Sequence, residues 1–299
     1  MIGRTLRAGC WAMVLWACCV CAAAGEVHGA DGARDGLPDG LPDSPGAVAS
    51  AGVGAATGAA TGLTGRERDA ACQLGALRGK ACRANWWPIL LEAFESTAIE
   101  NTGNIVFDDE TRHDLVSNPY WATYVKCVHQ FRYRQWRDDD DFLVDYVGHG
   151  MQGAEVASSF EQHDPTGRGL VYVNNGNYWR SRLKAMAWIA VVEVQWKIGP
   201  ASEASIGNSG LNTYDTPRVK GRSTNETGFQ DFVDTPVVGF WWNVAEDAMD
   251  RFVMPHIWRR THNRLILTAL LPLTPCKAAA NILRYKPFYY RDFPITPLR

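Results

Sequence analysis

The stretch that decides the fold runs from Gly228 to Pro255 and reads GFQDFVDTPVVGFWWNVAEDAMDRFVMP. On a helical wheel at about 100° per residue, its apolar side chains fill one broad arc. Opposite this arc lie Gly239, Asn243, Glu246 and Asp250. The pattern predicts a long amphipathic helix with a buried apolar arc and a solvated Glu246/Asp250 stripe. Asp247 and Arg251, one turn apart, are expected to pair.

The composition is that of a globular protein. The chain has 299 residues, of which 46% are hydrophobic and 12 are tryptophan, and this is enough to build a substantial core. The formal net charge of -2 gives no long-range field of either sign. It therefore gives no support for a nucleic-acid surface or for a polybasic membrane patch.

Residues 1–24 have the layout of a secretory signal peptide. Arg4 and Arg7 precede an apolar run that ends in three alanines at 22–24. The sequence therefore predicts export, with cleavage of the signal peptide. A membrane anchor is one alternative, although the run is shorter than the about 20 residues of a spanning helix. A lipoprotein attached through Cys18 is the other.

Residues 25–70 contain almost no large apolar side chain and are rich in Gly, Ala, Pro and Asp. Such a segment cannot bury enough surface to offset the entropy of ordering it, so we expect a disordered linker. Residues 71–299 follow as one helical domain of about six to eight helices, because apolar residues recur at helical spacing and no convincing alternation indicates a strand. The expected fold class is mainly α.

Four cysteines remain after removal of the signal peptide: Cys72, Cys82, Cys127 and Cys276. In principle they allow three pairings. Cys72 and Cys82 are close in the chain, so an oxidising compartment favours a local disulfide between them. Cys127 and Cys276 are interpreted as small buried apolar groups. No spacing among the four indicates a zinc site.

Two further helices carry candidate polar residues. The segment from Phe142 to Phe160 contains three glycines, which indicate the close approach of another helix or of a ligand. It places His149 one turn after Asp145, which can hold the imidazole, and a hydrogen-bonded core histidine is the simpler interpretation.

The segment from Trp179 to Ile198 is apolar on every side in its middle, so we expect a helix that is buried all round. Glu193 interrupts this apolar section. It either pairs with Lys197 one turn later or is desolvated, and desolvation raises the proton affinity of a carboxylate as it does in active sites.

Several motifs are similar to those of an uncharacterised family of exported bacterial envelope proteins. They are YVGHGMQGA at 146–154, YWRSRLKA at 178–185, GPASEASIG at 199–207, DTPVVG at 234–239 and EDAMDR at 246–251. The resemblance covers residues 86–293, and in such relatives a proline follows the histidine where this chain has Gly150. It implies an exported α-helical domain in which a histidine, a helix-borne glutamate and a late acidic segment recur, and it carries over no activity.

Two functions remain open on the sequence, and we favour the first. It is a non-catalytic structural or interaction domain of the envelope, in contact with a membrane surface or with an envelope protein, because Trp and Tyr suit interfaces with one wet side. The aromatic residues that suggest it are Trp86, Trp87, Trp241, Trp242, Trp258, Phe288, Tyr289 and Tyr290.

The second function is that of a hydrolase, with or without a divalent metal ion as its cofactor. The catalytic candidates are His149, Glu193, Glu246 and Asp250, and the candidate metal ligands are Asp231 and Asp234. No diagnostic motif such as HExxH or GxSxG is present. Convergence of His149 and Glu193 with Glu246 or Asp250 would favour the hydrolase.

Overall fold

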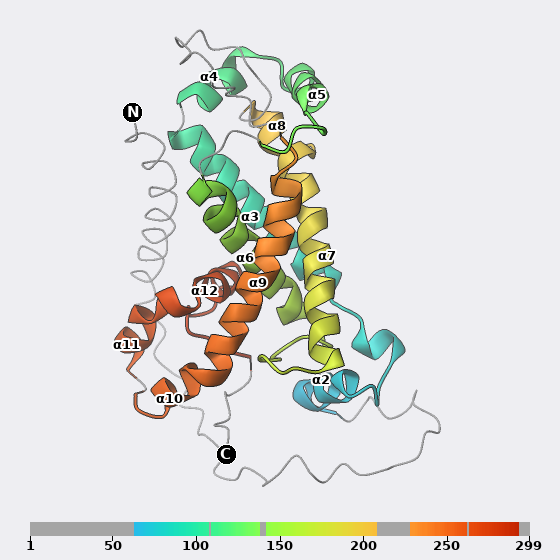
Figure 1. Cartoon of the computed structure of the whole chain (residues 1–299), viewed down its shortest axis with the longest axis vertical. Coiled ribbons are helices and arrows are strands. Elements are labelled where there is room, and N and C mark those ends of the chain that lie inside the picture. Colours follow the sequence, from blue (N-terminus) through green and yellow to red (C-terminus); the bar gives the residue numbers. More distant parts are fainter. Residues whose placement is uncertain (1–62, 108, 138–141, 208–227, 262, 293–299) are drawn as a thin grey trace.

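The computed structural model describes residues 63–292 except 108, 138–141, 208–227 and 262 (Figure 1). The predicted signal peptide and most of the predicted linker lie outside these residues. Within them there is no strand, and eight helices have nine or more residues, so the mainly α class is confirmed.

A central helix, α6 (His149–His163), organises the domain. It continues from a π-helical segment, η3 (Val144–Gly148). Four helices pack around α6, and they are α3 (Trp86–Phe107), α7 (Gly176–Ile198), α9 (Asp231–Phe252) and α12 (Pro275–Leu283). Figure 1 shows α7 and α9 as two long helices side by side.

Shorter elements close the two ends of this bundle (Figure 1). At one end lie α4 (Asp109–Ser117), α5 (Tyr120–Gln130) and α8 (Glu203–Ile206). At the other end lie α2 (Gly65–Gln73), η2 (Gly79–Cys82), α10 (Met254–Trp258), α11 (Arg264–Ala269) and η4 (Leu271–Leu273).

The folded domain begins earlier than predicted. Helix α2 covers the predicted boundary at residue 71, because Thr64 and Glu67 form a capping box in which each side chain binds the backbone amide of the other residue. The T-x-x-E pattern of this cap is short, and it was not recognised because it directly follows a segment of low-complexity composition.

The predicted disulfide between Cys72 and Cys82 is confirmed, with 5.5 Å between the two Cα atoms. It joins α2 to η2. Cys127 and Cys276 are free thiols and both are buried, as the sequence suggested. Burial raises the pKa of the Cys127 thiol to about 11, so this group stays protonated and poorly nucleophilic at neutral pH.

Helices α6 and α9 cross at their glycines. A Cβ atom added to Gly239 would lie 2.9 Å from the Cα atom of Gly153, and one added to Gly153 would collide with the carbonyl oxygen of Thr235. A Cβ on Gly150 would lie 2.6 Å from Cγ1 of Val238. The glycines in the helix of His149 are therefore explained by the close approach of another helix.

The outward faces of α3, α7 and α9 are apolar. Every exposed residue of α9 is apolar, as is every exposed residue of α7 after Lys184, and none of the exposed residues of α3 is charged. We call the exposed apolar residues of these helices the apolar belt: Trp86, Trp87, Leu90, Leu91, Phe94, Ile99, Val106, Phe107, Leu183, Ala187, Val191, Val194, Val233, Val237, Trp241, Ala245, Met249 and Phe252.

This arrangement reverses the one predicted for α9. The wheel separated the two faces correctly, but Trp241 on the apolar arc is 58% exposed, whereas Asn243, Glu246 and Asp250 are buried. The prediction of a solvated acidic stripe is therefore wrong. Its polar face turns inward because α6, α7 and α12 offer it cations and hydrogen-bond donors.

The helix from Trp179 to Ile198 is also less buried than predicted, since α7 exposes Leu183, Ala187, Val191 and Val194. The element surrounded on all sides is α6, whose residues from Gly153 to Glu161 are all buried. In the described residues no single helix combines the length and apolarity of a membrane span, although the bent pair Arg264–Leu273 and Pro275–Leu283, angled at 117°, meets those two criteria together.

Candidate functional site

A chain of buried charged side chains runs through the interior next to His149. Nδ1 of His149 lies 2.6 Å from Oδ1 of Asp231, and the other oxygen of Asp231 lies 2.6 Å from Nζ of Lys197. Lys197 also donates to Oε2 of Glu203 over 2.9 Å. This chain connects α6, α9, α7 and α8 and is almost completely shielded from solvent.

Three more carboxylates surround this chain. Asp145 accepts a hydrogen bond from Nε2 of Gln230 at 2.9 Å, and Glu100 accepts one from Nε2 of Gln152 at 2.6 Å. Glu193, which is 2% exposed, faces His149 and Lys197 electrostatically, but its Oε1 atom has no hydrogen-bond partner among the described residues.

We call these residues the His149 cluster: Glu100, Asp145, His149, Glu193, Lys197, Glu203 and Asp231. It contains five carboxyl groups, and among the described residues Lys197 and a protonated His149 supply positive charge to Glu100, Glu193, Glu203 and Asp231. The cluster therefore has room for additional positive charge, as protons or as a cation. Asp234, also buried, carries a further unpaired oxygen and lies one turn from Asp231 on α9.

Local structure explains why these residues meet. The π-helical segment η3 precedes His149 and contains Asp145, and single π-helical turns are frequent at functional sites. Glu193 and Lys197 are one turn apart on α7 and share a face. The glycine crossing of α6 and α9 then brings Asp231 to His149.

A second buried cluster, the Arg182 cluster, lies elsewhere along α9. Its cations are Arg182, Lys277 and Arg291, and its carboxylates are Glu161, Asp247 and Asp250. Nε of Arg182 lies 2.6 Å from Oδ2 of Asp247, and Nζ of Lys277 lies 2.8 Å from Oδ1 of the same residue. Three cations against three carboxylates make this cluster balanced.

Glu246 acts as a helix cap beside the Arg182 cluster. Its two carboxylate oxygens accept hydrogen bonds from the backbone amides of Cys276 and Lys277, at 2.8 and 2.9 Å. These amides belong to the first turn of α12, where a negative charge opposes the positive end of the helix dipole. Glu246 is thereby committed to holding α12 in place.

The predicted site residues therefore separate into two groups. His149, Glu193, Asp231 and, at its edge, Asp234 come together, as the hypothesis of a polar interior required. Glu246 and Asp250 also point inward, but they bind α12 and Arg291 instead of His149. The proposal that all of them share one cavity is wrong.

Three predicted side-chain pairings are replaced by others. Asp231, and not Asp145, holds the imidazole of His149. Lys197 binds Asp231 and Glu203 in place of the predicted pair with Glu193. Asp247 binds Arg182 and Lys277 instead of Arg251. In each case the partner comes from another helix, which offers a buried contact that a neighbour on the same helix cannot.

A serine and a histidine contact Glu92 of α3, a buried carboxylate that belongs to neither cluster. Nε2 of His163 lies 2.6 Å from Oε1 of Glu92, and the hydroxyl of Ser159 donates to its Oε2. Both groups bind the carboxylate in the middle, whereas a nucleophilic serine needs its base at hydrogen-bond distance. This set is therefore a structural contact between α3 and α6.

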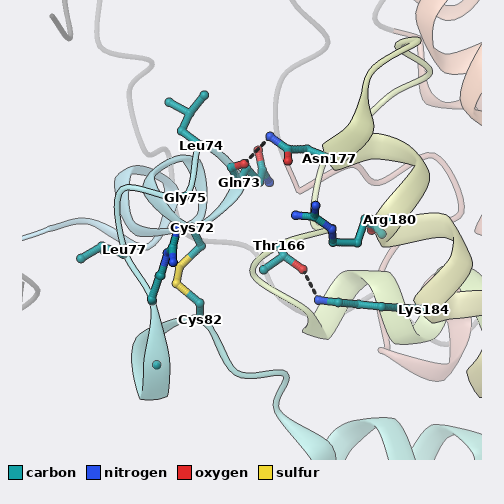
Figure 2. A pocket seen from close by; sticks show the side chains of 13 residues that line it. Cys72, Gln73, Leu74, Gly75, Leu77, Cys82, Thr166, Asn177, Arg180 and Lys184 are labelled. Carbon is teal, nitrogen blue, oxygen red and sulfur yellow. Dashed lines mark hydrogen bonds between the residues drawn. A yellow bond between two sulfur atoms is a disulfide. The ribbon is translucent and has the colours of Figure 1, made fainter. Parts of the chain in front are cut away.

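An open cavity among the described residues lies away from both clusters. It has a volume of about 600 Å³ and lies between the disulfide and the first turns of α7. Figure 2 shows Arg180 and Lys184 extending from α7 toward Cys72 and Cys82, and Nζ of Lys184 donates a hydrogen bond to the hydroxyl oxygen of Thr166. The cavity lining contains none of the predicted site residues.

Sequence reasoning missed several members of the two clusters. Glu100, Lys277 and Arg291 were not considered, and Arg182 appeared only as part of the YWRSRLKA motif. Glu203 had a usable signal, because it follows Ser202, the N-cap of α8, in a segment from 199 to 207 that has no other charged residue. Comparison of the chain with protein-family models, with curated proteins and with solved structures finds no match.

Proposed function

We propose that this protein is an exported bacterial envelope protein whose helical domain is non-catalytic and lies among the acyl chains of a membrane. The observation that carries the proposal is the inverted distribution of side chains. Many charged groups lie in the interior around α6, beside a buried apolar cluster that includes Val156 and Phe160, and the apolar belt covers the outward faces of α3, α7 and α9.

The apolar belt is too extensive for a surface in contact with water. Monomeric soluble proteins rarely expose contiguous apolar patches of more than a few hundred Å², whereas here large side chains such as Trp87, Phe94 and Trp241 are each more than half exposed. Burial of such side chains in hydrocarbon stabilises each by about 1.5 to 3 kcal/mol. A hydrophobic environment around the bundle is therefore strongly favoured.

The dimensions of the belt favour lipid. On α9 the exposed residues run from Val233 to Phe252, a rise of about 29 Å at 1.5 Å per residue. The hydrocarbon core of a bilayer is about 30 Å thick. Exposed cations occur beyond the belt, for example Arg180 at one end and Lys126 and Arg132 at the other, and Lys184 lies next to the first belt residue of α7.

The geometry favours lipid over a single protein partner. The three helices of the belt all pack on α6, α9 mainly with its polar side and α3 and α7 partly through buried apolar side chains such as Ile89 and Ile189, so their exposed apolar faces point away from α6 in more than one direction. One docked protein covers one face, whereas a bilayer surrounds the bundle. Ionisable residues inside a membrane face the interior of a bundle and pair with one another, as they do in the Arg182 cluster.

Spin-label accessibility tests this proposal. Single labels are placed at Val191→Cys and Trp241→Cys in a chain in which the buried Cys127 and Cys276 are replaced by alanine. The matched control is Val116→Cys on α4, a site that is 81% exposed and lies outside the belt. The protein is reconstituted in vesicles of phosphatidylethanolamine and phosphatidylglycerol.

Oxygen concentrates in hydrocarbon and a nickel chelate concentrates in water. We expect the labels at 191 and 241 to collide mainly with oxygen, and the label at 116 to collide mainly with the nickel chelate. Equal and high collision rates with the nickel chelate at all three positions would refute the proposal. Protection of 191 and 241 from both reagents, together with a doubled mass in detergent, would also refute it, because it indicates burial against a second copy.

A further inference from the structure

We propose that the His149 cluster holds a divalent metal ion, with Asp145, His149 and Asp231 as protein ligands and Glu193 as a fourth. One possible ligand atom from each of the first three residues lies within 4.8 Å of those of the other two, and all three residues are buried. Small side-chain shifts suffice to bring them to the about 2.0–2.2 Å bonds of such an ion. The proposal does not depend on membrane contact.

Glu193 is one of several buried carboxylates, Glu155 among them, with an oxygen that forms no hydrogen bond to a described residue, and it lies beside this site. Its side chain is 2% exposed, and its Oε1 atom forms no hydrogen bond with any described residue. Its strongest electrostatic neighbours are Lys197, His149 and Asp231, so it faces the same site. A buried carboxylate oxygen without a partner loses its hydration, and coordination to an ion restores it.

The charge of the cluster calls for a cation. Apart from Asp145, its carboxyl groups are those of Glu100, Glu193, Glu203 and Asp231, and among the described residues they are matched by Lys197 and at most one imidazolium. A divalent ion supplies two positive charges at the point where His149, Asp145 and Asp231 meet. The Arg182 cluster shows the contrast, since its three carboxylates have three cations and need no ion.

The groups behind the ligands are suited to a metal site. Lys197 holds Oδ2 of Asp231 at 2.6 Å, and Gln230 donates to Oδ2 of Asp145 at 2.9 Å. Such contacts to the second oxygen orient a ligating carboxylate. His149 loses its hydrogen bond to Asp231 and its proton as the ion binds. One imidazole with carboxylates suits Mn²⁺, Fe²⁺ or Zn²⁺.

Metal binding to the full chain tests the site. The protein is purified in detergent, stripped with a chelator, and equilibrated separately with Mn²⁺ and Zn²⁺. Bound ion per chain is then measured by mass spectrometry of the elements, and for Mn²⁺ also by the loss of the free-ion spin-resonance signal. The variants are Glu193→Gln and Asp145→Asn, which keep side-chain size, and the matched control is Glu155→Gln. Glu155 is a buried carboxylate of α6 outside the cluster, and Ser96 donates to it at 2.8 Å.

We expect about one ion per chain of at least one metal for the wild type and for Glu155→Gln, and an affinity at least tenfold weaker for Glu193→Gln and for Asp145→Asn. The proposal fails if the folded wild type binds neither ion, because protons alone then balance the cluster. It also fails if Glu193→Gln and Asp145→Asn bind as tightly as Glu155→Gln. Neither failure bears on the spin-label result, which reports only on the belt.

Discussion

Arg182 illustrates how a single residue organises the interior. It is 1% exposed, and its guanidinium contacts Asp247 at 2.6 Å, Glu161 at 3.1 Å and the carbonyl oxygen of Leu170 at 2.7 Å. The hydroxyl of Tyr178 donates to the same Asp247. Burying such charges costs several kcal/mol per ion, and these partners offset that cost.

Replacement of Arg182 therefore tests the energetic role of the Arg182 cluster. In Arg182→Met, Glu161 and Asp247 both lose their ion pair with Arg182 but stay buried. We therefore expect the free energy of unfolding to fall by about 3–5 kcal/mol. Arg112→Met removes the exposed pair with Asp109 and should cost less than about 1 kcal/mol. Denaturant unfolding in detergent micelles measures both. Similar losses for the two variants would contradict the cluster's stabilising role.

At the level of single residues, the sequence predicted which residues belong to the polar interior better than it predicted which residues they contact. His149, Glu193 and Asp231 were selected as candidates because polar groups in apolar helices are unusual, and they do meet. Their pairings were assigned from helical spacing, which sees only neighbours on one helix. Asp247 instead pairs with Arg182, 65 residues away, and such contacts depend on packing.

Among the elements, the crossing of α6 and α9 fixes the position of the His149 cluster. Gly153 and Gly239 allow the two backbones to touch, and Asp231 then reaches His149. Close contacts of this kind through small residues stabilise helix pairs in membranes, where the exclusion of water contributes little.

An added methyl group measures the importance of this crossing. We expect Gly239→Ala to lower the free energy of unfolding by about 1–3 kcal/mol, because its Cβ would overlap backbone atoms of α6 that cannot move alone. Gly103→Ala on α3 is the control, since no atom lies within 4 Å of its added Cβ. It should be neutral or stabilising by up to about 1 kcal/mol, because alanine favours helix. Thermal unfolding in detergent compares the two, and equal effects would contradict the tight crossing.

The helices themselves were largely predictable, but their orientation was not. Apolar residues at helical spacing located α6, α7 and α9, and the wheel separated the two faces of α9. Periodicity does not show which face of a helix is buried, however. The usual assumption that the apolar face is buried holds for proteins that are surrounded by water. Trp241 and Asn243 were therefore assigned to opposite environments from those that they occupy.

On the scale of the whole described domain, a core that contains many charged groups beside an apolar cluster is enclosed by helices with apolar outward faces. Glu155, Ser158 and Glu161 lie at the centre on α6, whereas Trp87 and Val191 lie on the outside. This order is unfavourable in water, and the proposed lipid environment makes it favourable, because it leaves paired charges inside and hydrocarbon outside.

Arginine substitutions in the apolar belt test that environment energetically. In lipid, Val191→Arg and Trp241→Arg should each cost about 2.5–3.5 kcal/mol and reduce the amount of protein recovered in membranes. On a surface in contact with water, such changes are usually within about 0.5 kcal/mol. Val116→Arg outside the belt is the control and should leave recovery unchanged. Normal membrane recovery of all three variants would argue against lipid contact.

The late positions of Lys277 and Arg291 in the sequence affect when the core can form during synthesis. Helix α9 is synthesised first, but Asp250 depends on both of these later residues, and Asp247 shares Lys277 with it. During translation the charges of these α9 carboxylates are therefore not fully matched until the C-terminal segment has been synthesised. We therefore expect folding of the core to be a late event in synthesis.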